Sequence, residues 1–209
     1  MPLPYLANVD DLKAYPGQKP ASDAEAQLAL RIASGAIRNR TKQTLSFVAG
    51  DTVTLTGGQR VLTLPQRPLV VDDDNPLTVV EIVDGTGLEI PAVEGRDFIR
   101  KGSELHRGET WPTSRLMGWP HRQRIGIWAD LVRVTYSHGF LEIPDDLVGI
   151  CLDLAAATIA NPNRLRSESA GATAVTHTVE TFGTGSLTAD HEKLLRDYMR
   201  STSWSVTQS

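Results

Sequence analysis

The residues from about Leu45 to Phe140 have the pattern of β-strands, whereas the segments on both sides have the spacing of amphipathic helices. In the central stretch, short runs rich in β-branched residues alternate with Gly-Gly, Asp-Gly, Asn-Pro and single prolines about every ten residues, which is typical of an antiparallel sheet. We expect six or seven strands, in the runs DTVTLTG, RVLTLP, LTVVEIV, GLEIPAV, DFIRKG, SELHRG and DLVRVTYSHGF. The sequence therefore predicts an α+β fold, in which a small helical bundle carries an inserted antiparallel β-subdomain over residues 45–140.

The first long helix is predicted from about Asp23 to Arg40. Ser22 is followed three residues later by Glu25, which is the spacing of a capping box. Apolar and small residues then recur at helical spacing, and we expect them to form one face that another helix can approach closely. The residues expected on this face are Leu28, Ala29, Ile32, Ala33 and Ala36.

A second long amphipathic helix is predicted to begin at Pro144 and to end before Asn161-Pro162. Proline suits the first helical position because its missing N–H costs nothing there, and the two aspartates that follow match the positive end of the helix dipole. A short helix in NVDDLKAY, capped by Asn8, and a third helix in LTADHEKLLRDYMR, capped by Thr188, complete the bundle. The apolar face of the second helix is expected to hold Leu147, Ile150, Cys151, Leu154, Ala155 and Thr158.

The length of 209 residues favours a single domain over residues 1–209. Within it, residues 161–186 are rich in Gly, Ser and Thr and are predicted as a long loop, and residues 201–209 as a flexible C-terminal tail. The chain shows no signal peptide and no run approaching the ~18 apolar residues of a membrane span, so we expect a soluble protein made in the host cytoplasm. Its single cysteine, Cys151, excludes a disulfide within the chain.

The charge is unevenly distributed along the chain. The net charge of -4 argues against a generic nucleic-acid-binding protein, which is usually basic. The segment from Arg96 to Arg133 nevertheless holds eight basic and four acidic residues, so it has a net charge of +4. These bases can be solvated strand edges and loop tips, or they can form a face that meets an acidic partner. A nucleic-acid-binding accessory protein that uses this segment is therefore the alternative function.

The sequence contains no recognisable catalytic or metal-binding pattern. No two of its five histidines are spaced to share a helical face, and we interpret His138 as a hydrogen-bonded histidine at a strand end. Cys151 falls on an apolar helix face, where burial makes a thiol unreactive. We therefore expect no enzymatic activity, no cofactor and no metal, although a hydrolase or carbohydrate-binding site within the β-subdomain stays open.

Several aromatic and basic residues are candidates for contact with partner proteins. Trp111 and Trp119 flank prolines in an Arg-rich stretch, where they can pack at a loop base or at a protein interface. Trp204 lies in the predicted flexible tail, and an apolar side chain there exposes surface unless a partner receives it. The complete predicted interface set is Trp204, Tyr198, Arg164, Arg166, Trp111 and Trp119.

The order of the motifs resembles the head-to-tail connector, or adaptor, proteins of long-tailed bacteriophages. The resemblance rests on YSHGF leading to IPDDL and an alanine-rich helix, on NPNRLRSESAG after that helix, and on LTADHEKLLRDY near the end. NVDDLKAY, SDAEAQLALRIASGAIRNRT and LTGGQRVLTLPQRPLV precede them in the same order, so the resemblance covers nearly the whole chain.

This resemblance implies a structural virion protein that catalyses no reaction. It implies that copies form a dodecameric ring under the portal protein, at the neck of the virion. The ring would extend the DNA channel and join the DNA-filled head to the next connector, stopper or tail-completion protein. Double-stranded DNA would pass through its lumen without specific binding.

Overall fold

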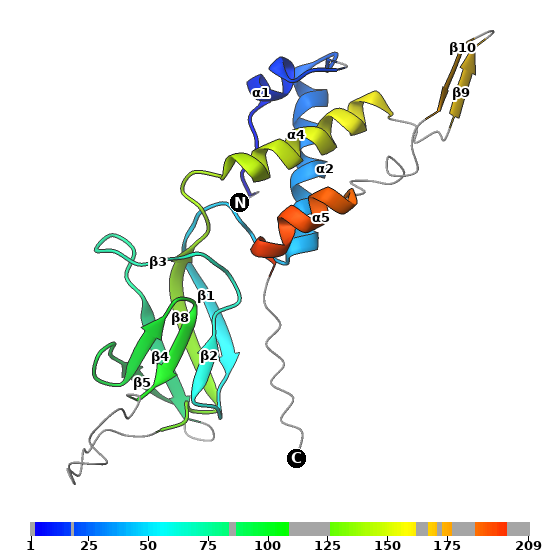
Figure 1. Ribbon diagram of the computed structural model, residues 1–209. Coiled ribbons are helices and arrows are strands. Elements are labelled where there is room, and N and C mark those ends of the chain that lie inside the picture. The colour runs from blue at the N-terminus through cyan, green and yellow to red at the C-terminus, as the bar shows by residue number, and fades with distance from the viewer. Residues whose placement is uncertain are drawn as a thin grey trace, which may run out of the picture. The chain divides into compact units, whose positions relative to one another are not determined.

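A computed structural model describes residues 3–17, 19–83, 87–108, 126–161, 167–170, 173–176 and 187–199 (Figure 1). The predicted α+β class is confirmed, because these residues form four α-helices and an insertion of eight strands in two antiparallel sheets. The chain divides into two compact units. The helical unit comprises Met1–Ser46 and Phe140–Ser209, and the β unit comprises Phe47–Gly139. None of the described helices is both long and apolar enough to cross a membrane.

The helical unit is built around the contact between α2 and α4. Its helices are α1 (Val9–Ala14), α2 (Asp23–Thr41), α4 (Asp145–Ala160) and α5 (Ala189–Leu195), followed by the 3-10 turn η2 (Arg196–Tyr198). Small residues on both long helices are buried in the shared core, which lets the two backbones approach closely. These small residues are Ala26, Ala29, Ala33, Cys151 and Ala155.

The helix starts largely follow the predicted caps. The Ser22 hydroxyl accepts from the Glu25 N–H at 3.2 Å, and the Glu25 carboxylate accepts from the Ala21 N–H, so the capping box is present. Thr188 caps α5 by accepting from the His191 N–H. Asn8 occupies the N-cap of α1 without a capping bond from its side chain.

Pro144 lies one position earlier than predicted. It is the N-cap of α4, with ψ of 141°, and Asp145 is the first helical residue. The fixed φ of proline suits both the N-cap and the first helical position, so the sequence alone does not distinguish the two positions.

The predicted apolar face of α2 is partly wrong. Leu28 is 48% exposed, whereas Ala26, Leu30 and Ile37 are completely buried. Leu28 lies about 200° around the helix axis from Ala26, because each residue turns the helix by about 100°. The alanines Ala26 and Ala33, rather than the larger leucine, mark the side that meets α4.

The β unit contains two antiparallel sheets that enclose one core. The larger sheet has the order β1–β8–β4–β5, with β3 also paired to β8, and the smaller has the order β2–β7–β6. The strands of the larger sheet are β1 (Val48–Thr56), β3 (Leu69–Val70), β4 (Thr78–Val83), β5 (Leu88–Ala92) and β8 (Leu131–His138). Those of the smaller sheet are β2 (Val61–Thr63), β6 (Phe98–Lys101) and β7 (Glu104–Arg107). Trp128, Tyr136 and Leu105 are the largest side chains buried in this core.

Two strand features differ from the prediction. All seven predicted runs contain a strand, and the eighth strand, β3, is only two residues long, so it leaves no periodic signal. Within residues 161–186, predicted as a loop, the structure places an antiparallel pair of β9 (Ser167–Ala170) and β10 (Thr173–Thr176). The prediction of a plain loop missed this pair because its sequence lacks large apolar residues.

We predict that Leu154→Asp unfolds the helical unit, because Leu154 is 5% exposed and a buried unpaired carboxylate costs several kcal/mol. The same substitution at Leu28, which is 48% exposed, should change the free energy of unfolding by less than about 1 kcal/mol. Urea unfolding followed by circular dichroism measures both variants. Equal losses of stability would contradict the assignment of the buried faces.

Candidate functional site

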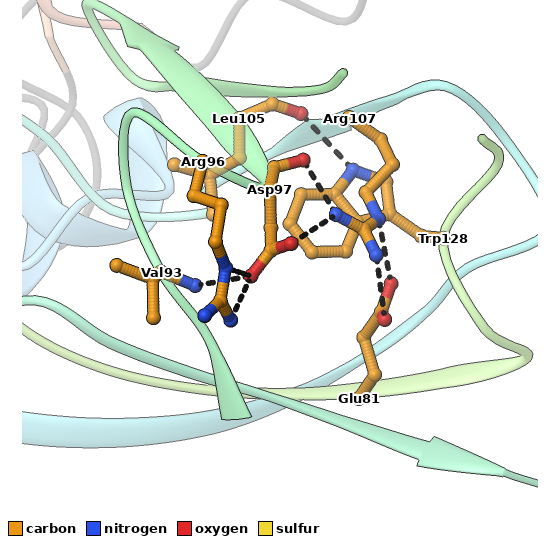
Figure 2. Close-up of polar contacts among 7 residues, drawn as sticks. All are labelled: Glu81, Val93, Arg96, Asp97, Leu105, Arg107 and Trp128. Atoms are coloured by element: carbon orange, nitrogen blue, oxygen red, sulfur yellow. Dashed lines mark hydrogen bonds and ion pairs between the residues drawn. The ribbon is translucent and has the colours of Figure 1, made fainter. Parts of the chain in front are cut away.

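A buried polar site surrounds Arg107 in the β unit (Figure 2). Arg107 on β7 and Glu81 on β4 are both buried, and they form a two-point ion pair. The Arg107 Nε lies 3.1 Å from Glu81 Oε1, and Nη2 lies 3.2 Å from Oε2. Because the two strands belong to different sheets, the pair connects the sheets across the core.

Trp128 and Asp97 complete the surroundings of the guanidinium, as Figure 2 shows. The Cζ atom of Arg107 lies 5.4 Å from the centre of the Trp128 ring, within the range of a cation–π contact. Trp128 donates its Nε1–H to the Leu105 carbonyl at 3.1 Å. Arg107 Nη1 also donates to the backbone carbonyl of Asp97 at 2.5 Å. The guanidinium is thus surrounded by groups of its own chain.

The Asp97 carboxylate is the third charged group of this site. It accepts from the Val93 N–H at 2.9 Å and from the Arg96 Nε and Nη2 at 3.1 Å and 2.7 Å. The Arg96 hydrogen bonds lower the pKa of Asp97 to about 2, although partial burial opposes this shift. A carboxylate with so low a pKa holds no proton to donate at neutral pH, so it suits a structural role better than general acid catalysis.

The described part of the Arg96–Arg133 segment does not present a free basic face. Arg96 pairs with Asp97, and Arg100 pairs with Glu94 at 3.3 Å. Arg133 on β8 pairs with Glu89 on β5 at 3.0 Å, and Arg107 is buried with Glu81. Lys101 is exposed, and Arg115, Arg122 and Arg124 lie outside the described residues.

His138 is a hydrogen-bonded histidine at the end of β8, as the sequence predicts. It is 1% exposed, and its Nε2 lies 3.1 Å from Asp51 Oδ2 on the neighbouring strand β1. The next residue, Gly139, has φ of 92° and donates its N–H to the Pro68 carbonyl. His138 therefore marks the bend at which the chain leaves the sheet.

The other described residues considered for chemistry are also bound within the chain. His106 lies 3.1 Å from Glu104, and His191 lies 3.3 Å from Asp153. Burial raises the pKa of the Cys151 thiol, which keeps it in its unreactive form. Among the described positions, no three His, Cys, Asp or Glu residues gather as a metal site would require. His121 and His177 fall outside that part of the chain.

Tyr198 is the one member of the predicted interface set that the structure describes. Its hydroxyl donates to Asp146 on α4, at 2.9 Å and 2.7 Å from the two carboxylate oxygens. Its ring packs edge-on against Phe140, with 5.9 Å between the ring centres. Burial and the Asp146 contact raise the pKa of Tyr198 to about 12. Tyr198 thus holds η2 onto α4, and a role toward a partner stays a prediction.

Trp204, Arg164, Arg166, Trp111 and Trp119 all lie outside the described residues. Sequence reasoning missed the cluster around Arg107, because its members come from β4, from β7, from the loop between β5 and β6, and from the residues before β8. The one sequence signal for this cluster was that Glu81 and Arg107 lie in runs predicted as strands, near apolar residues.

No known protein-family profile and no curated protein matches this chain. Chains of several solved structures align with most of this chain, among them the following three. A chain in the neck of an empty GTA particle is 23% identical with a TM-score of 0.47, covering 83% of this chain and 86% of its own. A chain in the virion of a native gene transfer agent particle is 21% identical with a TM-score of 0.46, covering 80% and 83%. One in the neck of a native GTA particle is 19% identical with a TM-score of 0.43, covering 83% and 88%.

We predict that Glu81→Gln destabilises the protein by about 3 kcal/mol, because it leaves a buried guanidinium without its charged partner. The double variant Glu81→Leu, Arg107→Met should lose much less, because it removes both charges together. Urea unfolding of the two variants and the wild type tests this expectation. A double variant less stable than Glu81→Gln would show that the pair itself stabilises the fold.

We also predict that Asp97 contributes stability above about pH 4 and that this contribution disappears as the pH falls toward its folded pKa of about 2. The pKa of Asp97 in the folded protein lies below the ordinary value of 3.8, so the unfolded chain takes up the proton first as the pH falls. Proton uptake therefore favours unfolding over this pH range. The loss should amount to at most about 2 kcal/mol. The difference in unfolding free energy between wild type and Asp97→Asn should shrink over this pH range, and a constant difference would contradict the prediction.

Proposed function

We propose that this protein is a head-to-tail connector of a long-tailed phage-like particle. Copies form a dodecameric ring under the portal protein, extend the DNA channel, and join the DNA-filled head to the next connector, stopper or tail-completion protein. The protein is then a structural component of the virion neck, made in the host cytoplasm. Double-stranded DNA passes through the ring without specific binding.

The observation that best supports this proposal is that separate motifs of the resemblance contact each other in the fold. Asp146 belongs to IPDDL and Tyr198 to LTADHEKLLRDY, and they share two hydrogen-bond contacts. His191, from the second motif, contacts Asp153 on α4. These two motifs are far apart in the sequence, yet their residues contact each other within the helical unit. Such contacts are expected if the motifs belong to one fold of the kind that the resemblance implies.

The chemistry of the described residues also favours a structural role. The buried charges are paired with each other, and the buried thiol is held in its neutral form. Exposed apolar side chains, such as Leu141 at 73% and Leu28 at 48%, provide surface for contacts between proteins. A connector needs such surfaces for its neighbours and for the proteins above and below it.

The alternative function in nucleic-acid binding finds less support. Arg96, Arg100, Arg107 and Arg133 already neutralise carboxylates of the same chain. Among the described bases of the Arg96–Arg133 segment, few therefore remain to replace counterions on a phosphate backbone. A steep dependence of DNA affinity on salt concentration would favour this alternative.

The proposal predicts that the protein is present in purified particles in a ratio of about one copy per portal subunit, as stacked rings of equal symmetry require. Quantitative mass spectrometry of purified virions measures this ratio. The major capsid protein serves as an internal standard, and a non-structural phage protein controls for contamination. Absence of the chain from the particles would contradict the proposal.

A further inference from the structure

The outer face of α2 is exposed and lies opposite the face that meets α4. Leu28, Arg31 and Gly35 are exposed, and their spacing of three and four residues places them on one side of the helix. Ala26 and Ala33, which belong to the core shared with α4, lie on the other side. The outer face of α2 therefore points away from the core of the helical unit.

Two residues of this outer face have no partner within the described part of the chain. No described residue pairs with the Arg31 guanidinium. Gly35 lies in the middle of the helix, and a Cβ atom there would meet nothing within 4 Å. Glycine is less favourable than alanine at such a position, because it loses more backbone entropy on folding. A contact with another protein would account for both residues.

The residues at the start of α4 form a second exposed surface of complementary chemistry. Leu141 is 73% exposed, more than any other large apolar side chain among the described residues. Glu142 and Asp145 follow it and are also exposed, and neither carboxylate pairs with a described residue. This surface therefore combines an apolar side chain with two negative charges, whereas the outer face of α2 combines one with a positive charge.

We propose that the outer face of α2 in one copy packs against the start of α4 in a neighbouring copy. Leu141 packs on Leu28 in the open space beside Gly35, and Arg31 meets the two carboxylates that follow Leu141. This inference rests on the proposed function, because a cyclic ring needs two different surfaces of the same chain in each contact. The outer face of α2 points away from α4, so each copy offers both surfaces at once and the contact repeats around the ring.

Another exposed apolar site of the helical unit fits the α2 face less well. On α5, Leu194 is 49% exposed and Asp190 lies one turn before it. That site supplies a single carboxylate, and the base Lys193 beside Leu194 would repel Arg31. The start of α4 supplies two carboxylates and no base.

Mixed single-cysteine variants test the contact between copies. Full-length Leu28→Cys and Leu141→Cys are mixed at up to about 1 mM, where contacts with millimolar dissociation constants are populated, and treated with a short thiol cross-linker. Mass spectrometry should identify the peptides of positions 28 and 141 joined to each other. A mixture of Leu28→Cys with Leu194→Cys should not join, and wild type, whose single cysteine is buried, reports the background.

Two results of this experiment would overturn the inference. The first is the absence of a peptide that joins positions 28 and 141. The second is a cross-link of Leu28→Cys only to itself, because that product indicates a two-fold contact between identical faces.

Charge reversal tests the polar part of the contact. Arg31→Glu should raise the dissociation constant of self-association at least about tenfold, because it brings like charges together. Adding Asp145→Arg to this variant should restore much of the affinity. Adding Asp190→Arg, which also reverses an acidic residue in a first helical turn, should not. Sedimentation velocity measures association and circular dichroism confirms folding, and wild-type affinity of Arg31→Glu would refute the contact.

The variant Gly35→Leu separates the contact from folding. It should fold at least as well as the wild type, because the space around Gly35 is open within the chain. It should nevertheless associate more weakly, because the new side chain occupies the space that Leu141 of the neighbour needs. Undiminished association of this variant would contradict the proposed packing.

The outcomes also separate this contact from the proposed function. If the chain is counted in virions but positions 28 and 141 do not cross-link, the connector role stands and the contact is wrong. If the cross-link forms in solution but the chain is absent from virions, the contact stands and the connector role is wrong.

Discussion

The β unit can be inserted into the helical unit because its first and last strands are neighbours. Val48 of β1 lies opposite His138 of β8, and beyond this pair Ser46 bridges Phe140. The Phe140 N–H donates to the Leu45 carbonyl at 2.7 Å. The chain therefore leaves and re-enters the helical unit at adjacent points. This closure lets α2 and α4 share one core although the whole β unit separates them in sequence.

Within the β unit, the buried charge of Arg107 is matched by the buried carboxylate of Glu81. Burying Arg107 is costly unless its guanidinium is fully paired, and Glu81, the Asp97 carbonyl and the Trp128 ring supply that environment. Similar ion pairs also reduce the number of unpaired basic side chains nearby. In the described part of the basic Arg96–Arg133 segment, Arg100, Arg107 and Arg133 are paired with carboxylates from the loop after β5, from β4 and from β5.

The helical unit connects the fold to the proposed role in assembly. Small residues bring α2 and α4 together, and α5 returns to them through Leu195 and polar contacts with α4. Asp146 and Asp153, two turns apart on α4, receive Tyr198 and His191 respectively. These contacts hold α5 and η2 against α4, while Leu28, Leu141 and Leu194 of the same unit stay exposed.

The sequence by itself determined the α+β class, the helix starts at Ser22 and Thr188, the seven main strand positions and the structural role of His138. These features depend on hydrogen bonds and periodicities within a few residues, which the local sequence specifies. Only the tertiary structure decided which side of α2 is buried, that β3 joins β8, and that Arg107 meets Glu81. Such pairings depend on packing between segments distant in the chain, where many partners have suitable chemistry and the shape of the core selects one.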